Sequence, residues 1–136
     1  MKAFVTGGTG FIGRAVVRKL IERGYSVSAL ARSESGGAML RAMGAVVIPG
    51  DITDRESMRE GMRGSDVVFH IAAIYQFTQE ALARAESVSV GGTRNVLELA
   101  VELSIPRIVY TSTVAVFGDT RGEVPDETYY AGGPFL

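Results

Sequence analysis

Three glycines, Gly7, Gly10 and Gly13, are spaced three residues apart near the start of the chain. They follow a short apolar segment, residues 2–6, and open a segment with helical periodicity, residues 10–23. Glycines between a strand and a helix allow a tight turn, let the backbone approach a phosphate and let helix and strand pack closely. The free N–H groups and the positive end of the helix dipole attract phosphates. The spacing therefore favours a pyrophosphate-binding loop over a glycine-rich turn without a ligand.

Two arginines stand where they could contact phosphate groups. Arg14 lies in the first turn of the expected helix, where a cation is unfavourable unless a phosphate is bound; the alternative is a solvated surface residue. Arg32 follows the second apolar segment, and Ala31 stands where an acidic residue would bind the ribose 2′-hydroxyl of NAD. An arginine there can bind the 2′-phosphate of NADP. We therefore expect NADP as the cofactor; in the alternative, NAD binds and Arg32 is only an exposed loop residue.

The composition is that of one soluble globular domain, and it excludes several kinds of site. The chain has 136 residues, 46% of them hydrophobic and 21% charged, with a net charge of -1. This balance has no basic excess for binding nucleic acid or an anionic membrane. Because there is no cysteine and only one histidine, His70, we expect no disulfide, no thiol nucleophile and no metal site. No apolar run is long enough to span a membrane, and we expect a cytoplasmic location.

The elements that must position these residues alternate between short β-branched runs and longer segments with helical periodicity. This alternation predicts an α/β fold: a doubly wound (Rossmann) parallel sheet, strand order 3-2-1-4-5, between two helix layers. Residues 1–118 would form this domain and residues 119–136 a loop after it. The predicted strands are 2–6, 25–31, 45–48, 67–71 and 107–112; the predicted helices are 10–23, 38–43, a helix to residue 63 capped by Thr53 and Glu56, and 79–103.

Five stretches of this sequence are similar to motifs of one protein family. Residues 6–13, Thr-Gly-Gly-Thr-Gly-Phe-Ile-Gly, resemble the opening motif of the extended short-chain dehydrogenases/reductases, the NAD(P)-dependent epimerases, dehydratases and reductases. Residues 51–54 and 70–73 resemble the segments that follow the third and fourth strands of this family. Residues 92–98 resemble its long fourth helix, and residues 110–118 its fifth strand and active-site loop. The resemblance covers nearly the whole chain and is closest to dihydroflavonol-reductase-like and sugar-epimerase-like reductases.

The resemblance implies a cofactor site built from the glycine loop and the ends of the later strands. By this resemblance, the carboxylate of Asp51 accepts a hydrogen bond from the adenine amino group, and the N–H of Ile52 faces a ring nitrogen. Asp51 could instead be a turn residue. Ala72 and Ala73 would let the cofactor ribose approach, or could be small core residues. The implied cofactor-binding residues are Gly7, Thr9, Gly10, Phe11, Ile12, Gly13, Arg32, Asp51, Ile52, Ala72, Ala73 and Thr111.

The resemblance also implies a reaction centre of a serine or threonine, a tyrosine and a lysine, of which only the first is present. Thr113 stands at the Ser/Thr position, where its hydroxyl would orient the substrate oxygen; in the alternative the hydroxyl caps the backbone. No Tyr-x-x-x-Lys pair occurs, since Tyr129 is followed four residues on by Gly133 and Tyr130 by Pro134. We therefore expect the N-terminal part of a reductase, ending before the sixth strand and inactive alone.

The function implied is NADP binding for hydride transfer between the nicotinamide and a carbonyl or alcohol carbon of a small-molecule substrate. The alternative is a non-catalytic nucleotide-binding sensor or regulatory module. The fifth strand would form an apolar edge, which favours self-association unless residues 119–136 fold back over it. Gly91 and Gly92 inside the long helix indicate either a close approach on the cofactor side or a local kink.

Overall fold

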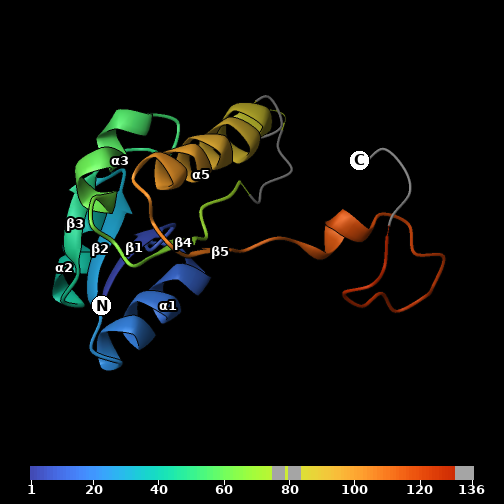
Figure 1. The fold of residues 1–136 in the computed structure, drawn as a ribbon, viewed down its shortest axis with the longest axis horizontal. Coiled ribbons are helices and arrows are strands. Elements are labelled where there is room, and N and C mark those ends of the chain that lie inside the picture. The colour runs from blue at the N-terminus through green and yellow to red at the C-terminus, as the bar shows by residue number, and fades with distance from the viewer. Residues whose placement is uncertain (75–78, 80–83, 131–136) are drawn as a thin grey trace.

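A five-stranded parallel sheet organises the chain (Figure 1). The computed structural model describes residues 1–74, 79 and 84–130. The strand order is β3-β2-β1-β4-β5, with every neighbouring pair parallel, as the sequence predicts. The strands are β1 (Lys2–Thr6), β2 (Ser26–Ala31), β3 (Val46–Pro49), β4 (Val67–His70) and β5 (Ile108–Tyr110).

The central strand β1 creates the switch point of the sheet. From β1 the chain moves first to β2 and β3 on one side and then crosses to β4 and β5 on the other. The register places Val5 beside Ala29 on one side and Phe69 on the other, and Thr6 beside His70. In open parallel sheets, ligands bind outside the carboxyl ends of the strands at such a point. The glycine loop follows directly after β1 and therefore lies there.

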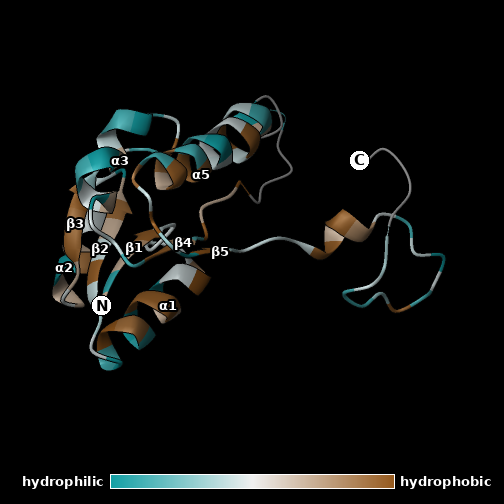
Figure 2. Ribbon diagram, in the orientation of Figure 1, coloured by the Kyte–Doolittle hydropathy of each residue, from teal (hydrophilic) through white to brown (hydrophobic). Residues whose placement is uncertain are grey.

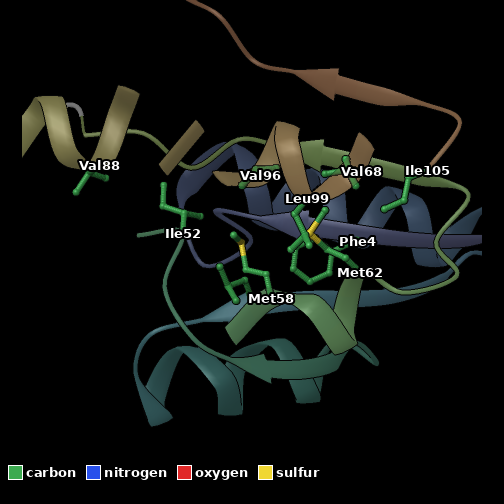
Figure 3. Packing of buried hydrophobic residues seen from close by; sticks show 11 residues of the cluster. Phe4, Ile52, Met58, Met62, Val68, Val88, Val96, Leu99 and Ile105 are labelled. Atoms are coloured by element: carbon green, nitrogen blue, oxygen red, sulfur yellow. The ribbon is translucent and has the colours of Figure 1, made fainter. Parts of the chain in front are cut away.

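Helices cover both faces of the sheet and bury two separate cores. Helices α1 (Phe11–Glu22) and α2 (Glu34–Ala42) share one core, in which Val17 and Leu40 are fully buried. Helices α3 (Arg55–Met62) and α5 (Thr93–Glu102) share the core on the opposite face (Figure 3). The architecture therefore has three layers, as predicted. Buried residues of the second core include Phe4, Met58, Met62, Val96 and Leu99.

Two helices begin at residues other than the predicted ones. Helix α2 was expected over residues 38–43 but begins at Glu34, because the Ser33 hydroxyl caps it by accepting the N–H of Gly36 at 3.2 Å. Helix α3 is capped by Asp54 and not by Thr53, so the predicted capping box is wrong. The Thr53 hydroxyl is already engaged, since it donates to Asp51 at 2.9 Å.

The predicted long helix, residues 79–103, contains a change of helix type. A π-helix, η1 (Glu86–Gly92), runs directly into α5, so the glycine pair lies in π-helical and not in α-helical backbone. Residues 80–83 of the predicted helix lie outside the described residues. A π-turn holds one more residue than an α-turn, so it changes which side chains after it face the sheet.

The chain leaves the sheet after β5. A short 3-10 helix, η2 (Val114–Phe117), and the segment after it extend away from the strands (Figure 1). Figure 2 shows η2 as hydrophobic, although the side chain of Val114 is 82% exposed. Residues 119–130 do not cover β5, and residues 131–136 lie outside the described part. No helix in the described part of the chain is both long and apolar enough to cross a membrane.

Candidate functional site

The turn after β1 is too tightly packed to hold side chains at two of its glycines. Gly7 has a φ of 73°, in the left-handed region, and a Cβ there would lie 2.6 Å from the backbone nitrogen of Ala72. A Cβ at Gly13 would lie 2.0 Å from the carbonyl oxygen of Gly7. The turn therefore packs directly on the segment after β4 and on the first turn of α1, which brings two motifs of the sequence together.

The N-terminus of α1 is open. Its N-cap, Gly10, has no side chain with which to cap this helix end, and the first turn holds no acidic residue. The first turn lies at the surface, since Phe11 is 88% exposed and Ile12 is 55% exposed. The side chain of Arg14 lies beside the turn and donates to the carbonyl of Gly10 at 3.3 Å. Open N–H groups, a positive dipole end and a nearby guanidinium fit an anionic ligand such as a pyrophosphate.

Arg32 and Asp51 lie together at the carboxyl ends of β2 and β3. Their closest charged atoms, Arg32 Nη1 and Asp51 Oδ2, are 3.8 Å apart, and the Arg32 side chain is 69% exposed. An exposed ion pair of this kind contributes little to stability. The guanidinium is therefore free to turn toward a ligand phosphate at small cost. The structure thus brings together the residues expected to contact the 2′-phosphate and the adenine.

The loop between β3 and α3, residues 50–54, is held by its own polar side chains. Asp51 Oδ1 accepts from the backbone N–H and the hydroxyl of Thr53, each at 2.9 Å. The backbone N–H of Asp51 donates to the Ser57 hydroxyl at 3.2 Å. Ile52 is 4% exposed and packs in the core. One carboxylate oxygen of Asp51 therefore shapes this turn, and the other faces Arg32.

His70 connects β1, β4 and α5 through a buried hydrogen-bond network. The residue is fully buried, its Nδ1 lies 2.7 Å from Thr6 Oγ1 and its Nε2 lies 2.9 Å from Thr93 Oγ1. The Thr6 hydroxyl also accepts from the backbone N–H groups of Ile71 and Ala72, each at 3.3 Å. This network fixes the segment after β4 against the glycine turn. Both ring nitrogens of His70 therefore have hydrogen-bond partners at the end of β4.

The same network assigns the tautomer of His70. Because the Thr6 oxygen accepts two backbone N–H groups, its proton points to Nδ1 of His70, and the ring proton stands on Nε2 and points to Thr93. Burial lowers the pKa of His70 from 6.5 to about 4. The imidazole is therefore neutral near pH 7 and structural in character.

The remaining predicted residues follow β4 and β5. Ala73 is exposed, and Ala72 is partly buried with its N–H bound to Thr6. The exposed Thr111 donates its backbone N–H to the carbonyl of His70 at 3.0 Å. Thr113 is exposed and accepts the N–H of Ala115 at 3.3 Å, so its hydroxyl caps η2 as the alternative interpretation expected. This contact leaves the proton of the hydroxyl available to a ligand oxygen.

Asn95 is a site residue that sequence reasoning missed. Its side-chain Nδ2 donates to the backbone carbonyls of Ile52 at 2.9 Å and Thr53 at 3.3 Å. Asparagine is a weak helix former, so its position inside α5 was the available signal. In the described part of the chain, no group of three or more acidic or histidine side chains could hold a metal ion.

The sequence profile of the NAD dependent epimerase/dehydratase family matches residues 3–135. The chain belongs to this family. The match includes the glycine turn, the loop 50–54 and the segment after β4, which the structure gathers at the switch point of the sheet. The resemblance stated from the sequence motifs is therefore confirmed.

Individual members of the epimerase/dehydratase family share the sequence and the fold. A 4-hydroxy-2-methyl-3-oxo-4-farnesyl-3,4-dihydroquinoline-1-oxide ketoreductase of Stigmatella aurantiaca is 43% identical over 121 residues, which cover 89% of this chain and 36% of the relative. A protein of Synechocystis sp., whose name is that of a dihydroflavonol 4-reductase, is 43% identical over 130 residues. These residues cover 93% of this chain and 37% of the relative. The chain thus spans little more than a third of the length of these curated relatives.

A solved structure from the superfamily shows the same fold with a dinucleotide bound. The short-chain dehydrogenase/reductase superfamily protein from Agrobacterium tumefaciens, crystallised with bound NAD, superposes with a TM-score of 0.81 at 27% identity. The superposition covers 100% of this chain and 39% of that protein. The chain therefore shares the fold of the matching 39% of this protein.

Proposed function

We propose that this chain is the NADP-binding part of an extended short-chain reductase. The observation that carries the proposal is the open N-terminus of α1, which follows the glycine turn at the switch point of the sheet. Two residues at the end of β2 support NADP over NAD. Arg32 is exposed, and position 31 is an alanine where an acidic residue would bind the ribose 2′-hydroxyl of NAD. The reductase names of the two curated relatives support a reductase over a non-catalytic sensor.

Most of the predicted residues then have a physical task in the bound state. The N–H groups of residues 11–13 would hold the pyrophosphate, and Arg32 the 2′-phosphate. Asp51 and Ile52 would contact the adenine, and the small side chains of Ala72 and Ala73 would leave room for the nicotinamide ribose. NADPH, when bound, supplies a hydride for a carbonyl carbon of a small-molecule substrate. Thr113 would orient the oxygen of that carbonyl.

The proposal assigns binding, and not turnover, to these 136 residues. They contain no Tyr-x-x-x-Lys pair, so they lack the tyrosine that would give a proton to the substrate oxygen and the lysine that would lower its pKa. A positioned proton donor typically contributes about 10²–10⁴-fold to a rate. We therefore expect no hydride transfer above the uncatalysed rate from this chain alone, and cofactor affinity is the quantity to measure.

Calorimetric titration of the chain with NADP and with NAD tests the proposal. We expect tighter binding of NADP in the wild type. Arg32→Ala should weaken NADP binding by about tenfold, the loss of one or two charge-assisted hydrogen bonds, and leave NAD binding unchanged. Arg23→Ala is the matched control, because Arg23 is exposed at the opposite end of α1. Equal affinities for the two cofactors, or the same affinity ratio in Arg32→Ala, would contradict NADP preference; binding of neither cofactor would contradict the proposal as a whole.

A further inference from the structure

The loop 50–54 is attached to a helix that comes much later in the chain. The two carbonyls that accept from Asn95, those of Ile52 and Thr53, are 43 and 42 residues away from it in sequence. The contacts from Ser57 and within the loop span six residues or fewer. Local contacts fix the shape of the loop, whereas the contact with Asn95 fixes its place relative to α5.

Gly92 provides a second attachment on the same helix face. A Cβ at Gly92 would lie 2.6 Å from both Cγ1 and Cδ1 of Ile52, so the backbone of η1 lies directly on this side chain. Figure 3 shows Ile52 between Val88 of η1 and Met58 of α3, in the core cluster that they share. Gly92 and Asn95 are three residues apart and therefore share one helix face. Gly92 therefore makes the close approach, and the residue approached is Ile52, whereas a Cβ at Gly91 would meet only the carbonyl oxygen of Glu86, at 3.9 Å.

The direction of the two expected adenine-binding groups depends on these attachments. The N–H of Ile52 lies in the peptide unit next to the carbonyl of Ile52 that Asn95 binds, and the carboxylate of Asp51 is on the residue just before. A loop released from Asn95 can tilt while its local turn stays intact, since Asp51 would still accept from Thr53. A tilt of this kind misdirects hydrogen bonds to a base without unfolding the loop.

We propose that Asn95 is a positioning residue: it holds Asp51 and Ile52 in the orientation that recognises the adenine base. Gly92 assists it by letting the helix lie close to Ile52. This inference rests on the proposed function, because it presumes that a dinucleotide binds at the switch point. It assigns to α5, which carries none of the expected cofactor-contacting residues, control over the selectivity for the nucleobase.

The test compares NADP with its analogue in which hypoxanthine replaces adenine, so that an oxygen stands in place of the amino group. Dissociation constants are measured by calorimetry on the full chain. We expect the wild type to prefer the adenine compound by about tenfold or more, because hypoxanthine has an oxygen in place of the amino donor and a proton on the neighbouring ring nitrogen. Asn95→Asp keeps the shape but removes both side-chain donors and places a carboxylate against two carbonyls. We expect it to reduce the preference to about twofold or less.

Two further variants separate positioning from stability. Ile105 is buried in the same core and follows the end of α5. Ile105→Val should destabilise this core without changing the loop 50–54, and should therefore keep the full preference for adenine. Gly92→Ala displaces Ile52 without altering Asn95, and should lose the preference even if Asn95→Asp does not fold. An unchanged preference in the folded variants, or no preference in the wild type, would overturn this inference alone. If the wild type binds neither compound, the proposed function fails and this inference fails with it.

Discussion

Gly10 and Gly13 stand in the same turn but leave very different room for a side chain. A Cβ at Gly13 would lie 2.0 Å from the Gly7 carbonyl oxygen, whereas at Gly10 the same oxygen is 3.3 Å away and nothing else is close. Gly10 also has an ordinary extended backbone, with φ -78° and ψ 175°. We expect Gly13→Ala to destabilise the fold by about 1–3 kcal/mol through overpacking. Gly10→Ala should cost less than about 1 kcal/mol and mainly obstruct the phosphate.

Urea unfolding and NADP titration of both variants check this difference. The expected pattern is normal stability with weakened binding for Gly10→Ala, and lowered stability for Gly13→Ala. Gly64→Ala is a useful reference, because a Cβ there meets no atom within 4 Å and Gly64 lies at the other end of the sheet, before β4. Its positive φ of 67° causes strain without affecting the ligand site. Full NADP affinity in Gly10→Ala would argue against phosphate binding at this helix end.

The buried His70 makes the stability of the fold depend on pH. Its pKa is about 4 in the folded chain and 6.5 when exposed. Between these values the unfolded chain binds a proton that the folded chain excludes, so stability is complete above pH 6.5 and is lost as pH falls toward 4. The loss amounts to about 3 to 4 kcal/mol, from 1.36 kcal/mol for each unit between the two pKa values.

Unfolding free energies of the wild type and His70→Gln, measured from pH 7.5 to pH 4, test the contribution of this group. We expect His70→Gln to have a lower free energy of unfolding than the wild type at pH 7.5, because glutamine does not reproduce both hydrogen bonds to Thr6 and Thr93. It has no proton to gain, however, so the variant should lose less stability than the wild type on acidification. Parallel pH profiles for the two proteins would show that His70 does not titrate on unfolding.

At the scale of elements, α3 and α5 are joined across the surface of the sheet by ion pairs. Arg55 pairs with Glu98 and Glu102, and Arg59 pairs with Glu102 as well as with Glu56 on its own helix. The hydrogen bond from Arg59 lowers the pKa of the Glu102 carboxyl. Since α5 carries Asn95 and α3 follows the loop 50–54, these pairs connect the two helices that hold this loop.

We therefore expect Glu102→Gln to lower the melting temperature more than Glu60→Gln does. In the described part of the chain, Glu60 pairs only with Arg63, the residue that follows the end of α3, so it controls for the loss of one surface carboxylate. The difference between the two variants should shrink in 1 M salt, where charges are screened over about 3 Å. An effect that is equal in both variants, or independent of salt, would contradict a cross-helix attraction.

The sequence predicts the elements that depend on local interactions better than those that depend on contacts between distant segments. The strands and α1 were predicted to within about two residues at most ends, because apolar periodicity is local and the glycine turn fixes its own neighbours. The start of α2 was missed because one Ser33 cap outweighs two glycines in the first turn. The π-helix and the contact of Asn95 with Ile52 were missed because both depend on packing between segments about 40 residues apart.

At the scale of the whole molecule, the described residues leave the sheet edge at β5 uncovered. Among these residues, strand β5 is last in the strand order and pairs only with β4. Val109 and Tyr110 of this strand are 46% and 51% exposed, and beyond them Val114 of η2 is 82% exposed. The net charge of -1 offers little repulsion between copies. An open strand edge with apolar side chains and weak charge repulsion favours pairing between chains.

We therefore expect this chain to self-associate through β5, and sedimentation velocity at several concentrations measures it. The average sedimentation coefficient of the wild type should rise with concentration. Val109→Lys places a charge on the open edge and should restore a monomer. Val101→Lys makes the same change on the outer face of α5, where Val101 is 75% exposed, and should leave association unchanged if β5 carries it. Loss of association in Val101→Lys alone would assign the contact between chains to the outer face of α5. A wild-type monomer whose sedimentation coefficient does not change with concentration, and which melts cooperatively, would show that the chain does not self-associate.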